Sequence, residues 1–143
     1  MKIKDVPQHP GILEDYGHEV CYAVDAEGNY NLVPSIGWMP KNIANEQAWE
    51  VIEANISRAA ESILRGNLSP LGYYMACHQM DIRLLAKYMG LYGWQVKRHL
   101  KPKVFSSLKP SLLEKYAGLF KVPVDDMTTL ADKLALGRPE TDK

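Results

Sequence analysis

The sequence contains no apolar run that approaches the ~20 residues a helix needs to span a bilayer. Its first residues, MKIKDVPQHPG, lack the apolar core of a secretory signal. Both absences predict a cytoplasmic protein with no membrane partner. The 143 residues, 46% hydrophobic and 24% charged, suit one ordinary globular domain or a small domain with an appendage.

Cysteine is scarce, and neither Cys21 nor Cys77 belongs to a zinc-binding spacing. Each is expected to be a small buried hydrophobe. Cys77 precedes His78, but a zinc site needs three or four ligands, and no nearby Cys, His or carboxylate completes one. The sequence therefore predicts no metal site.

Catalytic signatures are also missing. The sequence has no glycine-rich phosphate loop, nucleophile elbow or paired catalytic carboxylates, so we expect no enzyme activity and no cofactor. Aromatic residues in the first half could line a ligand pocket, but the core of a small β-plus-helix unit is the favoured interpretation. These residues are Tyr16, Tyr22, Tyr30, Trp38 and Trp49.

The chain has no net charge, but its charges are segregated. Residues 1–65 hold five Lys and Arg against ten Asp and Glu, and residues 122–143 hold three against five. Residues 66–121 hold nine Lys and Arg against only Asp81 and Glu114. A basic middle between acidic flanks indicates either a face that meets a polyanion or a lysine-rich solvated helix face.

Residues 1–17 contain two prolines and two glycines and are expected to be irregular. HEVCYAVDAEGNYNLV then predicts a β-hairpin, because Val20, Tyr22 and Val24 alternate with polar or small residues before a Gly-Asn turn. PSIGWMPK predicts a short third strand or a cover for the sheet. A long helix over Asn45–Arg65 carries an apolar stripe expected to cover the hairpin's apolar face.

Beyond Gly66 the pattern predicts five helices. The first follows the Ser69-Pro70 cap, the second follows Asp81 and ends at Gly90, and the third runs from Gly93 to Leu100. A fourth begins at Pro110, and a fifth is capped by Asp125. The predicted fold class is therefore mainly α, with a β-hairpin and long helix (1–66) followed by a five-helix domain (67–143).

Two segments carry a resemblance to a known family. LLAKYMGLYGWQVKRHL (84–100) resembles the helix-turn-helix of the lambda-repressor/Cro-type DNA-binding family, and SLLEKYAGLFKVPVDDM (111–127) is similar to the segment that follows it. The resemblance covers roughly residues 69–136. It implies a small residue at Ala86, a turn glycine at Gly90, an apolar plug at Leu91 and an inward Val96. Leu85, Met89 and Leu100 are expected to complete that core.

The resemblance also implies that the first exposed residues of helix 93–101 reach base edges in the major groove. The base-edge candidates are Gly93, Trp94, Gln95, Lys97 and Arg98. Basic and hydroxyl residues nearby, mostly in the loop expected after Leu100, suit phosphate contacts. The phosphate candidates are Arg83, Lys101, Lys103, Ser106, Ser107 and Lys109. His99 is expected either to contact phosphate or to be a solvated surface residue.

We therefore expect a sequence-specific binder of double-stranded DNA, acting as a transcriptional regulator. Such proteins commonly bind as two-fold dimers, so we expect a homodimer. The hairpin-helix unit 1–66 is a candidate dimerisation or partner surface, because an exposed hairpin edge can pair with its symmetry mate. The alternative is a protein-interaction module that keeps the fold without reading DNA. Ile82 and Tyr92 favour it, because the family often has a phosphate-anchoring glutamine and a capping Ser or Thr there. Trp94 favours it as a possible interface anchor.

Overall fold

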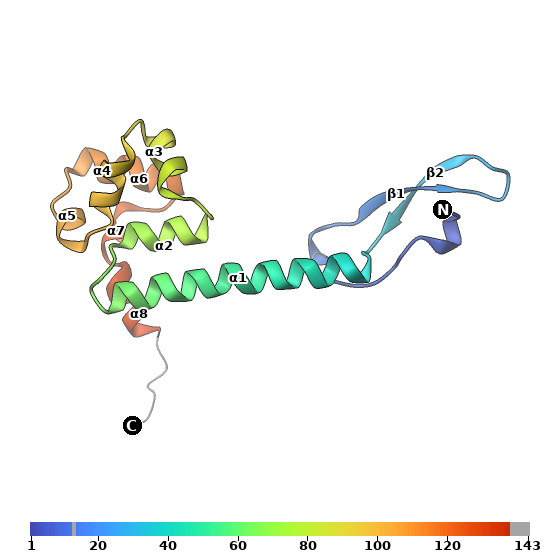
Figure 1. Ribbon diagram of the computed structural model, residues 1–143, viewed down its shortest axis with the longest axis horizontal. Coiled ribbons are helices and arrows are strands. Elements are labelled where there is room, and N and C mark those ends of the chain that lie inside the picture. The colour runs from blue at the N-terminus through green and yellow to red at the C-terminus, as the bar shows by residue number, and fades with distance from the viewer. Residues whose placement is uncertain (13, 138–143) are drawn as a thin grey trace, which may run out of the picture. The chain divides into compact units, whose positions relative to one another are not determined.

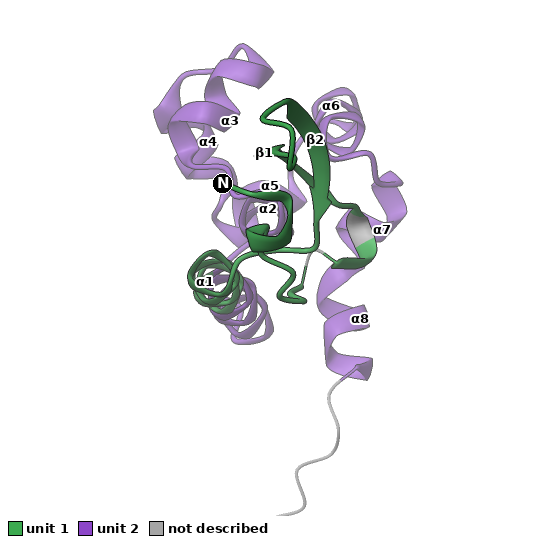
Figure 2. Cartoon of the chain, turned by 90° about the vertical axis from the view of Figure 1, so that its right-hand side faces the viewer, with its two compact units in different colours: residues 1–51 green, residues 52–143 purple. Residues whose placement is uncertain are grey.

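The computed structural model describes residues 1–12 and 14–137. Its contacts divide the chain into two compact units, unit 1 (Met1–Val51) and unit 2 (Ile52–Lys143), coloured separately in Figure 2. The chain is mainly helical, with one antiparallel hairpin near the N-terminus, as predicted (Figure 1). The described elements are the short 3-10 helices η1 (Ile3–Asp5) and η2 (Glu14–Tyr16), the strands β1 (Glu19–Val24) and β2 (Tyr30–Ser35), and the helices α1 (Met39–Leu64), α2 (Pro70–Cys77), α3 (Ile82–Met89), α4 (Gly93–His99), α5 (Pro102–Ser106), α6 (Pro110–Phe120), α7 (Val124–Thr128) and α8 (Leu130–Leu136).

The hairpin turn is held by one aspartate. The Asp25 carboxylate accepts hydrogen bonds from the backbone N–H groups of Glu27 and Asn29 and from the side-chain amide of Asn31. Gly28 supplies the positive φ of 88° that the turn requires. The Asn29 backbone bond, with the Asn31 and Glu27 bonds adding to it, holds the pKa of Asp25 below its ordinary value.

The expected burial of the hairpin's apolar face is wrong. Val20, Tyr22, Tyr30 and Leu32 are all more than 60% exposed, whereas Ala23, on the opposite face, is fully buried. The residues before β1 decide which face is covered. The buried Ser35 hydroxyl donates to the Pro7 carbonyl, so the N-terminal segment lies against the face that carries the smaller side chains.

The expected third strand is absent from the described residues that follow β2, and α1 begins at Met39, six residues earlier than predicted. Pro40 occupies the first turn, where its missing N–H group breaks no helical hydrogen bond. Asn42, on the next turn, is buried and donates to the carbonyls of His9 and Pro10. The start of α1 therefore binds the N-terminal segment through Asn42 and does not cover the apolar face of the hairpin.

The division between the units falls at residues 51 and 52, inside α1, so the predicted boundary at 66 lies within unit 2. Ile63, near the end of α1, is 5% exposed and belongs to the core of unit 2. That core joins buried side chains from α1 through α8. The largest fully buried side chains are Leu71, Leu85, Met89, Val96, Tyr116 and Met127.

Helices α2, α3 and α4 lie close to their predicted bounds, and the Asp81 carboxylate caps α3 by accepting from the Leu84 N–H at 2.7 Å. Two expectations are wrong. The residues after Lys101 form the short helix α5, because Pro102 fits a first helical position. The predicted fifth helix is divided at Thr129 into α7 and α8, and the N-cap residue of α7 is Pro123 rather than Asp125.

Candidate nucleic-acid interface

Helices α3 and α4 pack together across a three-residue turn, Gly90–Tyr92. Gly90 has a left-handed backbone, with φ 66° and ψ 32°, which non-glycine residues adopt at a cost. The Leu91 N–H donates to the Ala86 carbonyl at 2.9 Å, and the Lys115 ammonium donates to the Met89 carbonyl at 3.0 Å. These bonds satisfy the carbonyls at the end of α3 and fix where α4 begins.

The inner side of this helix pair forms part of the core of unit 2. Leu85 and Val96 are fully buried, and Ala86 and Met89 are nearly so. Leu91 and Leu100 are half-buried and pack against the same cluster. The structural positions predicted around the turn are therefore confirmed as core positions.

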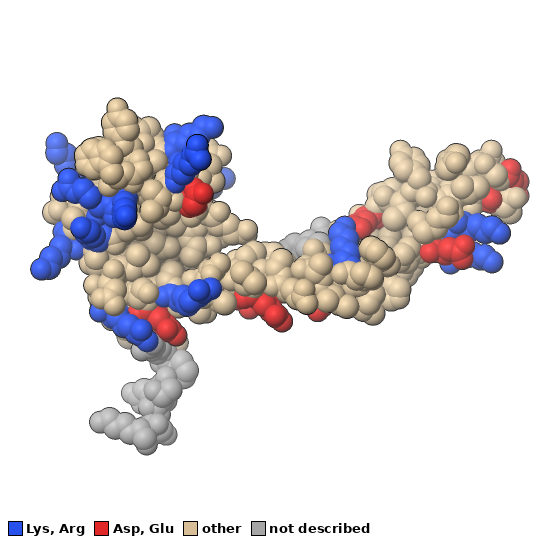
Figure 3. All heavy atoms as spheres, viewed as in Figure 1, with Lys and Arg blue, Asp and Glu red and all other residues tan. Residues whose placement is uncertain are grey.

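The outer side of α4 carries large and basic side chains. Trp94, Lys97 and Arg98 are three and four residues apart, which places them on one face of α4, and Lys101 follows two residues after the helix ends. All four are exposed, Trp94 by 59%. Figure 3 shows Lys and Arg side chains gathered over the part of unit 2 where Figure 1 labels α4 and α5, with no acidic side chain among them in this view.

Two base-edge candidates are placed differently from these four. Gln95 is half-buried, and its side-chain oxygen accepts a hydrogen bond from the Tyr92 N–H at 2.8 Å, which caps the start of α4. Gly93 begins the helix, and a Cβ added there would lie 3.8 Å from an Ile82 methyl carbon, an ordinary contact. Gly93 therefore offers DNA no side chain, and Gln95 has one polar atom committed within the chain.

His99 is partly buried and bonded within the chain, so the expectation of a solvated surface residue is wrong, whereas its phosphate contact stays a prediction. Its Nδ1 lies 2.8 Å from the hydroxyl of the fully buried Tyr116, and the two rings meet edge to face. Burial, and then the charge of Arg98, lower the pKa of His99. Burial raises the pKa of Tyr116 to about 12, so its hydroxyl remains a hydrogen-bond donor in neutral solution.

The phosphate candidates divide into two groups. Arg83, Lys101, Lys103 and Lys109 are exposed, and none forms an ion pair with the residues that the structure describes. The hydroxyl groups of the two serines instead donate hydrogen bonds within the chain. Ser106 donates to the Lys103 carbonyl and Ser107 to the Val104 carbonyl. The lysines and the arginine are therefore available to bind a phosphate. The serine hydroxyls cannot donate a hydrogen bond to it while they are bonded within the chain.

Sequence reasoning singled out Tyr92 and Trp94 as exposed aromatic residues beside the turn but missed Tyr88. Tyr88 is 62% exposed and Tyr92 is 72% exposed, and both flank the turn that leads to Trp94. Tyr88 follows the exposed Leu84 by four residues on α3. The sequence does carry a signal for this exposure, because Tyr88 falls between the inward positions Leu85 and Met89.

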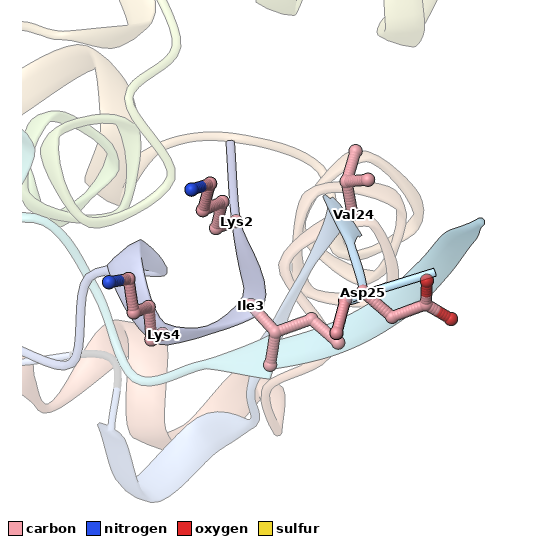
Figure 4. Close-up of a pocket in the computed structure, with 6 residues that line it drawn as sticks. Lys2, Ile3, Lys4, Val24 and Asp25 are labelled. Carbon is pink, nitrogen blue, oxygen red and sulfur yellow. The ribbon is translucent and has the colours of Figure 1, made fainter. Parts of the chain in front are cut away.

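Other parts of the chain offer less chemistry. A cavity of about 610 Å³ in unit 1 is lined by Lys2, Ile3, Lys4, Val24, Asp25 and Ala26. In Figure 4 the two lysines point away from the Asp25 carboxylate, which is already bound within the turn.

Residues 1–12 and 14–137 contain no cluster of three His, Cys, Asp or Glu side chains suited to a metal. None of the helices in the same ranges is long and apolar enough to cross a bilayer.

Comparison of the chain with protein-family models, with curated proteins and with solved structures found no match. The function of the chain must therefore be inferred from its residues and their geometry.

Proposed function

We propose that unit 2 binds double-stranded DNA, with α3 and α4 acting as a helix-turn-helix and α4 entering the major groove, and that the protein regulates transcription. The observation that carries this proposal is the contrast between the two sides of α4. On one side, Val96 is fully buried in the core of unit 2. On the other side, Trp94, Lys97 and Arg98 are exposed to solvent. Such a helix can be inserted into a groove without losing its support.

The roles of the exposed residues follow from their chemistry. Lys97 and Arg98 can donate to guanine O6 and N7, and Trp94 can pack on a thymine methyl or a sugar. Arg83, Lys101 and Lys103 suit phosphate oxygens, which set register and affinity but carry no sequence information. In this proposal the operator is read mainly by α4.

Salt dependence tests the proposal most directly. Each phosphate contact releases counterions, so log K for a random duplex should fall with log salt, by about 0.9 for each contact. Lys101→Ala and Lys103→Ala should each make that slope shallower by about one. Lys4→Ala, which removes an exposed lysine from unit 1, is the matched control and should leave the slope unchanged. Absence of binding at low salt would exclude this function.

Sequence specificity needs a second experiment. A site selected from randomised duplexes should be bound at least ~10³-fold more tightly than random DNA. Arg98→Ala should then reduce the preference for one base pair by about 1–3 kcal/mol, whereas Lys101→Ala should weaken all sequences alike.

A protein-interaction module is the second candidate. The exposure of Tyr88, Tyr92 and Trp94 around one turn favours it, since tyrosine and tryptophan are enriched in protein interfaces. This function predicts binding that survives high salt and is lost in Trp94→Ala, with no affinity for duplex DNA.

A further inference from the structure

The hairpin of unit 1 has two unlike faces. In the antiparallel register, residues directly opposite each other share a face, so Val20 lies with Pro34, Tyr22 with Leu32, and Val24 with Tyr30. All six side chains on this face are apolar or aromatic, and we call it the hairpin face. The other face carries the buried Ala23 and Ser35.

The hairpin face is open to solvent across most of its area. Tyr22 and Tyr30 are 71% and 77% exposed, and Val20 and Leu32 are each 62% exposed. These four side chains alone expose on the order of 500 Å² of mostly apolar surface, in the range of the largest apolar patch on a typical monomer. A patch of this size that is continuous over both strands is often a functional surface.

The strand edges are less available than this face. On the outer edge of β1, the Val24 N–H already donates to the Met1 carbonyl at 2.8 Å. Along β2, the Gln8 side chain donates to the Pro34 carbonyl and accepts from the Ile36 N–H. Pro34 itself lacks an N–H group to donate. The expected pairing of hairpin edges is therefore disfavoured, and the face is the open surface.

The chemistry of the hairpin face restricts its partner. It contains no charged residue, and its polar groups besides the backbone are the two tyrosine hydroxyls. A polyanion or a charged peptide would find no complementary charge there. The matching surface must itself be apolar, flat and largely uncharged.

The residues opposite each other make the hairpin face complementary to itself. Two of its three pairs join an aromatic to an aliphatic residue. A two-fold axis parallel to the strands would place each residue over the partner copy's residue of the same pair. Tyr22 would then contact Leu32 of the partner subunit, and Tyr30 would contact the partner subunit's Val24, so a tyrosine never meets a tyrosine.

We propose that the hairpin face is covered by a second copy of this chain, giving a homodimer in which two hairpins pack face to face. Sheets pack in this way about 10 Å apart with strands within about 30° of each other. The available area is below the ~800 Å² that each partner contributes to a standard interface, so the dimer is a weak, micromolar one. It depends on unit 1 alone and would hold even if unit 2 bound no DNA.

The test is sedimentation of the full chain over about 1–300 µM, a range that brackets a micromolar dissociation constant. The wild-type protein should pass from monomer to dimer. Tyr22→Lys and Leu32→Glu should each weaken the dimer more than ~10-fold, because each buries an unpaired charge. Trp49→Lys is the matched control, since Trp49 is an exposed apolar residue of unit 1 that lies on α1. It should leave the dimer intact.

Mixing the variants tests the geometry. In a mixture of Tyr22→Lys with Leu32→Glu, one contact pairs lysine with glutamate and the other is the native Tyr–Leu contact, so heterodimers should form. A mixture of Tyr22→Lys with Leu32→Lys should remain monomeric. Because all these positions are exposed in the monomer, circular dichroism should show each variant folded.

Two results would overturn the proposal. A wild-type chain that stays monomeric throughout the range would show that no second copy covers the hairpin face. A dimer that survives Tyr22→Lys and Leu32→Glu but dissociates in Trp49→Lys would place the interface on α1 instead.

Discussion

At the residue scale, buried polar contacts tie the end of α4 to neighbouring elements. The fully buried Ser69 donates its hydroxyl to the His99 carbonyl at 2.8 Å, and its N–H donates to the Leu100 carbonyl at 2.9 Å. Tyr116 holds the His99 ring from α6. The start of α2 and the end of α4 are therefore joined by both backbone and side chain.

Removing the Ser69 hydroxyl should destabilise the protein. Ser69→Ala leaves the His99 carbonyl without this donor in a buried place, at a cost of about 1–2 kcal/mol in the free energy of unfolding. Ser106→Ala is the control, because the same kind of bond to the Lys103 carbonyl is exposed there. Its effect should stay within ~0.5 kcal/mol. Urea titration measures both, and equal effects would contradict the role of burial.

His99 should make stability depend on pH. Its folded pKa lies below the ordinary 6.5, so below that pH the unfolded chain binds protons more readily than the folded one. The stability contributed by neutral His99 is thus full above pH 6.5 and is lost as pH falls through the folded pKa. Urea midpoints between about pH 5 and pH 8 should fall less on acidification in His99→Gln than in wild type. Parallel pH profiles would exclude this cause.

At the element scale, the helices that the sequence predicts well are those whose ends are encoded locally. Asp81 and Gly90 delimit α3 through a side-chain cap and a left-handed glycine, and neither needs a distant partner. The short helix α5 and the break at Thr129 were missed, because segments of five to seven residues show too few turns to display a period.

The hairpin shows a different limit. Alternation reveals that a strand has two unlike faces, but it does not say which face the rest of the chain will cover. Here that choice depends on Pro7 and Gln8, whose contacts with Ser35, Pro34 and Ile36 join residues far apart in sequence. At the candidate site, the partial burial of His99 could not be predicted for the same reason. Its hydrogen-bond partner Tyr116 lies 17 residues away in the sequence.

Replacing glycine by alanine should destabilise the protein at Gly90 and stabilise it at Gly118. Gly90→Ala places a Cβ on a left-handed residue and should cost roughly 1–2 kcal/mol, although no atom lies within 4 Å of it. Gly118 lies inside α6, is exposed and also has open space around it. Gly118→Ala should therefore stabilise the protein by about 0.5–1 kcal/mol. Thermal unfolding of both variants checks the two signs, and a loss in Gly118→Ala would be inconsistent with this account.

At the scale of the whole molecule, the two units differ in net charge and in the number of buried hydrophobic residues. The basic segment 66–121 lies wholly in unit 2, while residues 1–51 hold three Lys against eight Asp and Glu. Among the residues whose burial is described, Val6 and Ala23 are the buried hydrophobic residues of unit 1, whereas unit 2 has the entire large cluster around Leu71 and Tyr116. The two units should therefore differ in stability as well as in charge.

We expect unit 1 to unfold first. In Trp94→Phe, the remaining tryptophans are Trp38 and Trp49, both in unit 1, so fluorescence follows that unit while far-ultraviolet circular dichroism follows mainly the helices of unit 2. The fluorescence midpoint should come at lower urea. It should also rise with protein concentration, because dimerisation stabilises only the folded hairpin. Coincident midpoints would show one cooperative unit.

The bonds between Ser69 and the end of α4 have a consequence for the energetics of the proposed DNA binding. A helix fastened at its last turn is already ordered, so binding would not have to fold it, and little conformational entropy would be lost there. Calorimetry of duplex binding should accordingly give a small negative heat-capacity change, set by the surface buried, rather than the large one of coupled folding. In Ser69→Ala the same titration should show a more negative heat-capacity change and a larger entropic penalty.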